Sequence, residues 1–362
     1  MSRWINIKLT DKYILSQVLF ISALVLIIFL SIYLIFDFFE KIDNFWEAKV
    51  PSGTIITYFL FHLPSVIIQI LPATCLLGTL ISLGLLKKNN EFIVLKACGF
   101  SPYRITAPII ILGIIISVAL FFFNETILPK TISKAQSIWR YKVEKKRPRG
   151  GYMQEKIWLK SKDMIYQIEG MDFKRNIMWG VNIYYFDKNF KIKRRLNAHK
   201  ACWGNGKWVL YQGIEQIPGK GGVLEINQFT SKAIYLPETP NDFQFIKQDY
   251  ERLNYFDLRH YVNKLKSKGY NAVSFEVEMW QKTAIPWAPL LMIILAIPLG
   301  LKVGKTMKMI GLGLLIALIF WAMQALTLAL GKGGHLHSFL AAWIPNLLFG
   351  VWGIIMLRYV EE

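Results

Sequence analysis

The stretch that decides the fold is residues 87–104, which read KKNNEFIVLKACGFSPYR. It lies between two apolar runs that are each long enough to cross a bilayer. Asn89 or Asn90 can cap a helix here, and Glu91 then lies in the first turn, where the helix dipole favours a negative charge. Gly99 ends it. The stretch therefore predicts a short helix at about 89–99.

This short helix carries more apolar side chains than a polar connector needs. They are Phe92, Ile93, Leu95 and Phe100. Such a helix can be a docking surface for a partner held just outside the membrane. It can equally pack back on its own bundle, and the residues alone leave both interpretations open.

Composition indicates a membrane protein that crosses the bilayer several times. The chain of 362 residues is 54% hydrophobic and only 19% charged, and its apolar residues come in long runs. Lys and Arg outnumber Asp and Glu by 43 to 24. Residues 128–272 hold 28 of the basic and 13 of the acidic residues, so this region points to an anionic partner such as phosphate or nucleic acid.

The apolar runs predict six membrane spans, three on each side of a region without a long apolar run. They are Tyr13–Phe36, Ile55–Leu86, Ile105–Leu128, Ala284–Leu301, Met309–Leu330 and Phe339–Leu357. Asp37 to Glu47 is predicted to be a polar connector, and Pro64 and Pro72 are predicted to kink the second span.

Between the two groups of spans, short alternating segments broken by turn residues predict strands. They are Lys156–Lys160, Asp163–Glu169, Asn176–Phe186, Phe190–Cys202, Lys207–Ile217 and Val223–Leu236. Their number and spacing favour an all-β sandwich or jelly roll.

An amphipathic helix is predicted to join the β-domain to the fourth span, at the membrane surface. Asp257 caps it and Gly269 ends it. Its apolar face is made by Leu258, Tyr261, Val262 and Leu265. The predicted fold class is a membrane α-helical bundle with an inserted all-β jelly-roll-like domain. Its parts are residues 1–128, 129–256 and 257–362.

Basic residues in the short segments predict the orientation. With the N-terminus in the cytoplasm, eleven of them face the cytoplasm and three face the other side. Both termini and the short helix are then cytoplasmic, and the β-domain is periplasmic. Its basic excess therefore does not meet cytoplasmic nucleic acid.

The sequence predicts no catalytic residue, no metal site and no cofactor of its own. Gly304-Lys305-Thr306 resembles the end of a phosphate-binding loop, but Leu299 stands where the earlier glycine is required. Energy for any transport must then come from a partner, and the cytoplasmic helix is the place where that partner would bind.

The residues NEFIVLKACGFS at 90–101 resemble the coupling helix of the LptF/LptG permeases of the lipopolysaccharide exporter. The resemblance extends over nearly the whole chain. It includes Phe39-Glu40-Lys41 after the first span and Lys-Ile-Trp-Leu at 156–159. The segments at 257–266 and 278–282 look like the LptG branch.

The resemblance implies one permease of an ABC transporter in the bacterial inner membrane, paired with a second, LptF-like permease. Together they would take lipopolysaccharide from the outer leaflet and pass it to LptC-like and LptA-like jelly-roll proteins. A homodimer of an LptB-like ATPase, which binds ATP and Mg, would drive the movement. Glu91 would pair with a basic residue of that ATPase, and Phe92, Leu95 and Phe100 would fill its groove. The first and fifth spans would form lateral gates.

Cations near the outer membrane face would suit the phosphates of the lipid. The candidates are Lys41, Lys130, Lys134 and Arg140. The family places basic residues in these regions, but this sequence does not reproduce them position by position, because Asp37 and Glu40 are acidic where some relatives are basic. Lys130 and Lys134 can also be plain interfacial anchors.

Two other functions remain open on the sequence. One is an ABC permease for lipoprotein release, a class that usually has four spans per subunit. The other is a membrane scaffold that transports nothing and whose β-domain binds an envelope partner.

Overall fold

The computed structural model describes residues 9–145, 152–153, 157–161, 164–172, 175–187, 191–204, 206–218, 224–236, 238–240, 253–267, 271–302 and 306–359. The chain divides into two compact units. The helical unit comprises Met1–Lys146, Glu251–Arg259 and Val273–Glu362. The β unit comprises Arg147–Tyr250 and His260–Ala272.

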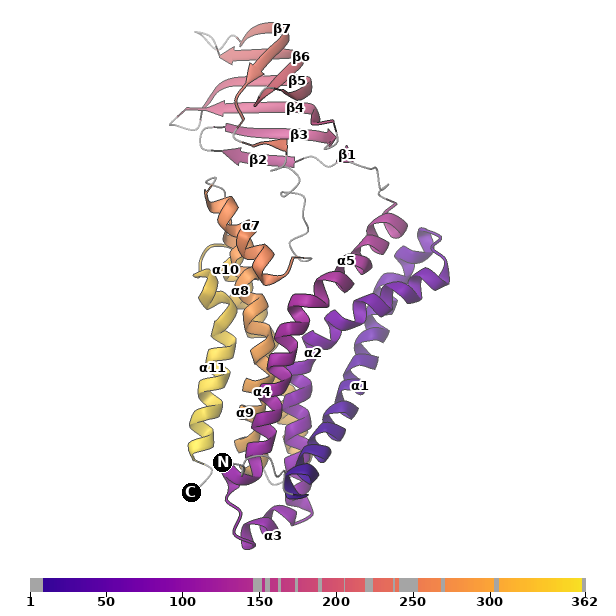
Figure 1. Cartoon of the computed structure of the whole chain (residues 1–362), viewed down its shortest axis with the longest axis vertical. Helices are drawn as coiled ribbons and strands as arrows, with labels where there is room; N and C mark the ends of the chain where they lie inside the picture. Colours follow the sequence, from indigo (N-terminus) through magenta and orange to yellow (C-terminus); the bar gives the residue numbers. More distant parts are fainter. Residues whose placement is uncertain are drawn as a thin grey trace, which may run out of the picture. The chain divides into compact units, whose positions relative to one another are not determined.

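Among the described residues of the helical unit, six helical segments are long and apolar enough to cross a membrane, as predicted. They are α1 (Leu9–Glu47), α2 (Ser52–Lys88), α4 (Pro102–Thr126), α8 with α9 (Val273–Ala284 and Ala288–Lys302, joined by a 3-10 turn at Ile285–Trp287), α10 (Thr306–Lys332) and α11 (Ser338–Arg358). The short helix α3 (Glu91–Ala97) lies between α2 and α4, at the end of the unit where α1 begins and α11 ends (Figure 1).

The centre of the helical unit is formed by α2 and α9. In their most apolar stretches 78% of the residues are buried, against 11% in α1 and 22% in α10. Leu76 and Leu80 of α2 pack with Met292 and Leu295 of α9 in one core cluster. Because α1 and α10 bury so little within this chain, they form its outer surface.

Residues 37–47 are helical, so the polar connector predicted there is wrong. Asp37 and Lys41, one turn apart on α1, form an ion pair, and Phe45 is fully buried. No helix-breaking residue interrupts this stretch. α1 ends only at Glu47, and Lys49 then adopts a positive φ of 56° two residues before Pro51.

Pro64 and Pro72 both lie inside α2, as predicted. Figure 1 shows the N-terminal part of α2 inclined to the rest of the helix. A proline lacks the amide hydrogen that the helix would donate and crowds the preceding turn, so a bend near these positions is expected.

Helical structure continues after the third span, which the sequence did not predict. α5 (Leu128–Ile138) and a π-helical turn at Trp139–Val143 extend the helical unit to Lys146, past the predicted boundary at 128. Ala135 of α5 is buried with Phe45 and Tyr58. The segment was missed because it has one apolar stripe and no long apolar run.

The β unit confirms the all-β prediction and most of the predicted strand positions. Its strands are β1 (Tyr152–Met153), β2 (Ile157–Ser161), β3 (Met164–Asp172), β4 (Ile177–Phe186), β5 (Ile192–Gly204), β6 (Lys207–Pro218) and β7 (Leu224–Ile234). They form one antiparallel sheet in the order β1-β3-β4-β5-β6-β7, with β2 paired to the same strand as β1. From β2 to β7 each described strand pairs with the next one in the sequence, and β7 has one neighbour among the described strands.

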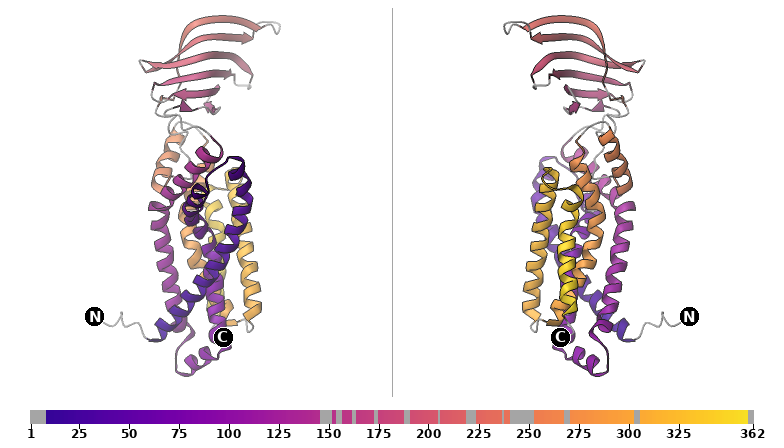
Figure 2. Two further views of the ribbon diagram at one scale, coloured as in Figure 1. Left: turned by 90° about the vertical axis from the view of Figure 1, so that its right-hand side faces the viewer. Right: turned by 90° about the vertical axis from the view of Figure 1, so that its left-hand side faces the viewer.

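A transverse bend explains how one curved sheet encloses a core (Figure 2). Core residues alternate along each strand, but across the bend their spacing is three, as from Met178 to Val181 in β4 and from Ala198 to Ala201 in β5. The registers on either side place the bend at Glu169, Gly180, His199, Gln212 and Thr230. Gly180 and Gln212 take positive φ values of 61° and 51°. These residues lie opposite one another in neighbouring strands, so the pairing register is unchanged across the bend and the same face of the sheet is turned to the core on both sides.

The predicted amphipathic helix is α7 (Tyr255–Ser267). The four residues expected on one face are all buried, which confirms that face: Leu258, Tyr261, Val262 and Leu265. The predicted cap is wrong, because the side-chain oxygen of Asn254 accepts the bond from the Asp257 amide at 2.7 Å. Asp257 lies in the first turn instead. Gly269 lies outside the described residues.

Candidate functional site

The helix α3 follows α2 after only two residues. Asn90 joins the two helices in a left-handed backbone conformation, with φ of 61°, and its side chain makes no capping bond. The predicted cap at Asn90 is therefore wrong, because a capping side chain needs an extended backbone at that position. Asn89 ends α2, and its side-chain amide donates to Glu91 Oε1 at 3.2 Å.

The end of α3 is where the sequence predicted it. Gly99 takes a φ of 87°, which a glycine adopts without strain. Its amide donates to the Lys96 carbonyl at 2.9 Å, and the Phe100 amide donates to the Leu95 carbonyl at 3.1 Å. This pair of bonds is the Schellman motif, which brings Phe100 back against the last turn of the helix.

The two sides of α3 face different surroundings. Phe92, Leu95 and Phe100 are partly buried against a core cluster of the helical unit that includes Ile14 and Ile105. Ile93 and Val94, by contrast, are each 58% exposed.

Thus the three predicted groove-filling side chains turn towards their own bundle. The outward apolar surface is made by Ile93 and Val94. Both interpretations of the sequence describe part of this helix, because one face packs inward and the other is open.

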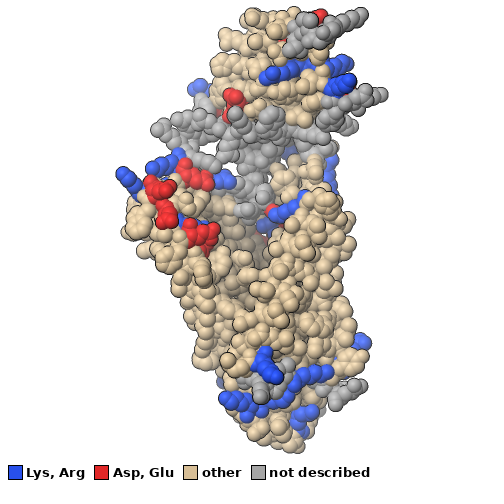
Figure 3. Space-filling model, turned by 180° about the vertical axis from the view of Figure 1, so that it is seen from behind, with Lys and Arg blue, Asp and Glu red and all other residues tan. Residues whose placement is uncertain are grey.

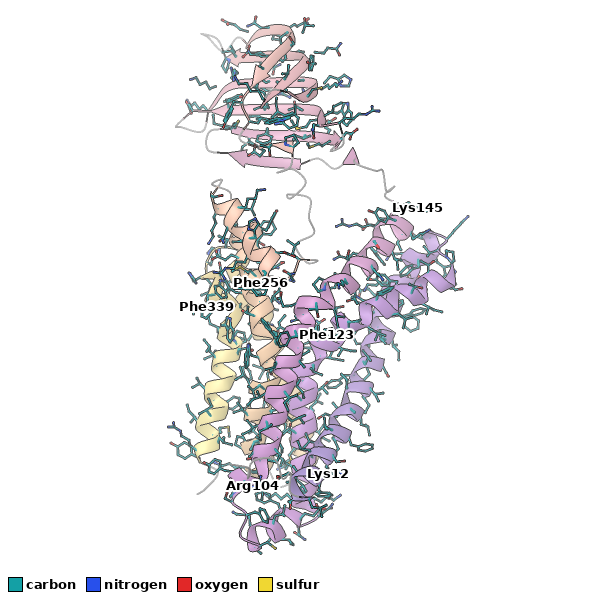
Figure 4. The ribbon with its side chains drawn as sticks, in the orientation of Figure 1. Lys12, Arg104, Phe123, Lys145, Phe256 and Phe339 are labelled. Atoms are coloured by element: carbon teal, nitrogen blue, oxygen red, sulfur yellow. The ribbon has the colours of Figure 1, made fainter. Side chains whose placement is uncertain are left out.

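Glu91 is bound within the chain. Tyr13 of α1 donates its hydroxyl to Glu91 Oε2 at 2.8 Å. Close by in the sequence, Asp11 of α1 pairs with Arg104 of α4 at 2.7 Å. Figure 4 shows Lys12 and Arg104 at the α3 end of the helical unit. On the face shown in Figure 3, Lys and Arg side chains gather at this end, and a broad uncharged surface follows.

Two of the four predicted lipid-binding cations, Lys41 and Lys134, lie against aromatic side chains of α2. Lys41 pairs with Asp37 and lies 5.6 Å from the centre of the Tyr58 ring. Lys134 of α5 lies 4.8 Å from the centre of the Phe61 ring, one turn further along α2. Both cations therefore lie against aromatic faces of the same helix, where a cation is attracted to the ring.

An aromatic cluster fixes the neighbouring backbone. The ring of Trp139 lies 5.4 Å from that of Phe45 and 5.7 Å from that of Tyr58. Arg140 follows Trp139 directly, and Lys130 is exposed one turn before Lys134. The structure thus brings the four predicted cations to the same end of α1, α2 and α5.

A family model described as "Lipopolysaccharide export system permease LptF/LptG" matches residues 12–359. The chain belongs to the LptF/LptG family. It is similar to the protein LptG of Escherichia coli strain K12, with 22% identity over 308 residues that cover 81% of this chain and 84% of that protein. It is also similar to LptG of Haemophilus influenzae, with 22% identity over 353 residues, 95% of this chain and 96% of that protein.

Family membership and the six apolar helices make this a multi-pass inner-membrane protein. An LptF/LptG protein is a permease of an ABC transporter and is not itself the catalytic subunit. Membership of this family gives the chain the role of a lipopolysaccharide export permease.

Sequence reasoning missed several residues of these two sites. Val94 and Tyr13 were not singled out, and Asp37 was assigned to a connector. A helical interpretation of residues 37–47 would have placed Asp37 and Lys41 four apart on one face and so would have found their ion pair. The contact between Tyr13 and Glu91 joins residues 78 positions apart and has no local signal.

Proposed function

We propose that this chain is the permease subunit that takes lipopolysaccharide from the outer leaflet of the inner membrane and passes it to a periplasmic β-jelly-roll bridge. Support comes from a family match over residues 12–359 and from relatives named as lipopolysaccharide export permeases. The energy comes from a separate cytoplasmic ATPase, which holds the ATP and Mg, while this chain holds no cofactor.

The observation that carries the proposal is the open face of α3. Two adjacent β-branched side chains, Ile93 and Val94, are each 58% exposed on a helix that lies between two membrane spans. Exposed apolar side chains on a rigid helix suit a groove of a partner protein. We assign that groove to an LptB-like ATPase dimer. Glu91 remains the residue proposed to meet a basic residue of the ATPase.

The charge distribution supports a cytoplasmic position for α3. The described short segments at its end of the helical unit carry Lys12, Lys87, Arg104, Lys302 and Arg358 among others. An excess of Lys and Arg is typical of cytoplasmic segments. In the proposed orientation both termini are cytoplasmic and the β-domain is periplasmic.

The lipid path is proposed to open at the two least buried spans. α1 and α10 bury 11% and 22% of their most apolar stretches, so both have large apolar surfaces available to lipid or to a second permease. We propose an LptF-like partner there, with α1 and α10 as lateral gates. Among the described residues β7 pairs only with β6, so its other side suits addition of a strand from an LptC-like or LptA-like protein.

The four cations Lys41, Lys130, Lys134 and Arg140 are proposed to meet the phosphates of the lipid. They lie at the end of α1, α2 and α5 that is opposite to α3. Lys130 and Lys134 are exposed, whereas Lys41 already has Asp37 as a counter-ion. The exposed lysines on α5 are therefore proposed as the first to meet an anionic lipid.

Substitution Ile93→Glu tests the docking proposal. It places a charge at the centre of the open face, and we expect it to weaken binding of the ATPase by about tenfold or more. The measurement is the amount of ATPase, second permease and phosphate-containing lipid that co-purifies with the chain from its native membrane.

The matched control is Trp46→Glu, which makes the same type of change at a residue that is 77% exposed near the other end of α1. This variant should retain the ATPase. Equal retention of the ATPase by both variants would show that α3 is not the docking surface.

The other two functions are less well supported. Six spans are present where a lipoprotein-release permease usually has four. A scaffold without transport would purify from mild detergent with no nucleotide-binding subunit, so the same co-purification separates it from the proposed exporter.

A further inference from the structure

Two polar contacts tie the first turns of α1 to the stretch at 91–104. Tyr13 donates to Glu91 Oε2 at 2.8 Å, at the start of α3. Asp11 pairs with Arg104 at 2.7 Å, in the first turn of α4. The side chain of Tyr13 is 49% exposed, so packing alone does not hold it. The hydrogen bond is therefore what orients its ring towards α3.

The apolar contacts lead to the same part of α1. Phe92, Leu95 and Phe100 pack against a cluster to which α1 contributes Ile14 and Val18. Further along, α1 has mainly exposed apolar side chains, such as Phe20, Ile27 and Phe36. A displacement of α3 therefore reaches the first turns of α1. Beyond Val18, the contacts of α1 within this chain are concentrated at Ser22, Val25 and Phe45.

Glu91 can serve two partners at once. Its Oε1 accepts from Asn89 at 3.2 Å and its Oε2 accepts from Tyr13. A carboxylate offers about four acceptor positions, so a cation of a docked protein can bind without displacing the tyrosine.

We propose that Tyr13 is a positioning residue that transmits movement of α3 to α1, with the pair of Asp11 and Arg104 as a second link. The inference rests on the proposed docking of an ATPase on α3. It assigns to Tyr13 the coupling between ATP hydrolysis and lipid movement, and it assigns the docking itself to the outer face of α3.

The test uses the full complex of this chain, the second permease and the ATPase in vesicles that contain lipopolysaccharide. Tyr13→Phe removes only the hydroxyl. We expect the lipopolysaccharide transferred to an added soluble jelly-roll protein per ATP hydrolysed to fall about tenfold, as for loss of a hydrogen bond to a charged group. Binding of the ATPase and the melting temperature should stay at the wild-type values.

Tyr103→Phe is the matched control, because the Tyr103 hydroxyl donates at the same end of the unit, to the Leu357 carbonyl at 3.3 Å. It should transfer lipid like the wild type. The second link has its own test, in which Asp11→Arg lowers transfer per ATP and the added substitution Arg104→Asp restores it.

Three outcomes would overturn the inference. Wild-type transfer per ATP by Tyr13→Phe would show that the hydroxyl transmits nothing. Loss of ATPase binding by Tyr13→Phe would place Tyr13 in docking and leave the proposed function standing. A wild-type complex that binds no ATPase or transfers no lipid would overturn the proposed function as well. The wild-type measurement therefore distinguishes failure of the proposed function from failure of the inference about Tyr13.

Discussion

At the scale of single residues, Asn346 donates a hydrogen bond to the backbone where a membrane span departs from α-helical geometry. Between α8 and α9 the Ala288 amide donates to the Ile285 carbonyl, in place of the Ala284 carbonyl that an α-helix would use. The side-chain amide of Asn346, which is 4% exposed, donates to the Ala284 carbonyl at 2.7 Å. In a membrane interior this carbonyl has no water to bind, so the additional bond from the asparagine stabilises the break.

Asn346→Leu should therefore destabilise the protein by about 1 kcal/mol, because it removes a buried hydrogen bond to the Ala284 carbonyl. The measurement is thermal unfolding in detergent. Asn44→Leu, at an exposed position of α1, makes the same chemical change and should leave the melting temperature near the wild-type value. A melting temperature for Asn346→Leu equal to that of the control would contradict this role.

At the scale of elements, one glycine allows the backbone of α1 to approach α2 closely. A Cβ atom added at Gly78 would lie 2.8 Å from the Cα of Ser22 on α1, a backbone atom that can move only with its helix. The backbones of α1 and α2 therefore approach each other closely at this point. Small residues allow helix backbones to approach in this way.

Gly78→Ala should destabilise the protein by about 1–3 kcal/mol through overpacking. Gly53→Ala lies in the first turn of the same helix, where an added Cβ meets nothing within 4 Å, and it should be neutral or stabilise by up to about 1 kcal/mol. Thermal unfolding of the two variants side by side measures the difference. The same sign for both would show that the α1 contact does not depend on this glycine.

At the scale of the whole molecule, the orientation in the membrane can be tested with thiol labelling. Cys98 is exposed just after α3, whereas Cys75 is buried in α2. In a Cys202→Ser background, Cys98 should react with a membrane-impermeant maleimide only from the cytoplasmic side. A second reporter, Asn227→Cys in a background without Cys98, lies at an exposed position of edge strand β7 and should react only from the periplasmic side. Labelling of both from one side would contradict the proposed orientation and the docking of an ATPase on α3.

Much of this protein is determined by its sequence through local physical chemistry. Runs of apolar residues fix the six spans, because a chain crossing lipid must satisfy its backbone within the helix and cover it with apolar side chains. Alternation and turn residues place the strands β2 to β7 to within a few residues. The buried face of α7 follows from the helical spacing of its apolar residues. The end of α3 at Gly99 follows from the ability of glycine to adopt a positive φ.

Only the tertiary structure decides which side of a helix packs against the bundle and which side stays exposed. Phe92, Leu95 and Phe100 turn inward because a core cluster built from α1, α2, α4 and α9 lies on that side, and Ile93 and Val94 are left exposed. The links of Tyr13 to Glu91 and of Lys134 to Phe61 join distant segments, as does the support that Asn346 gives to Ala284. A sequence pattern reports the period of a helix, whereas the partner that each face meets depends on the packing of the whole chain.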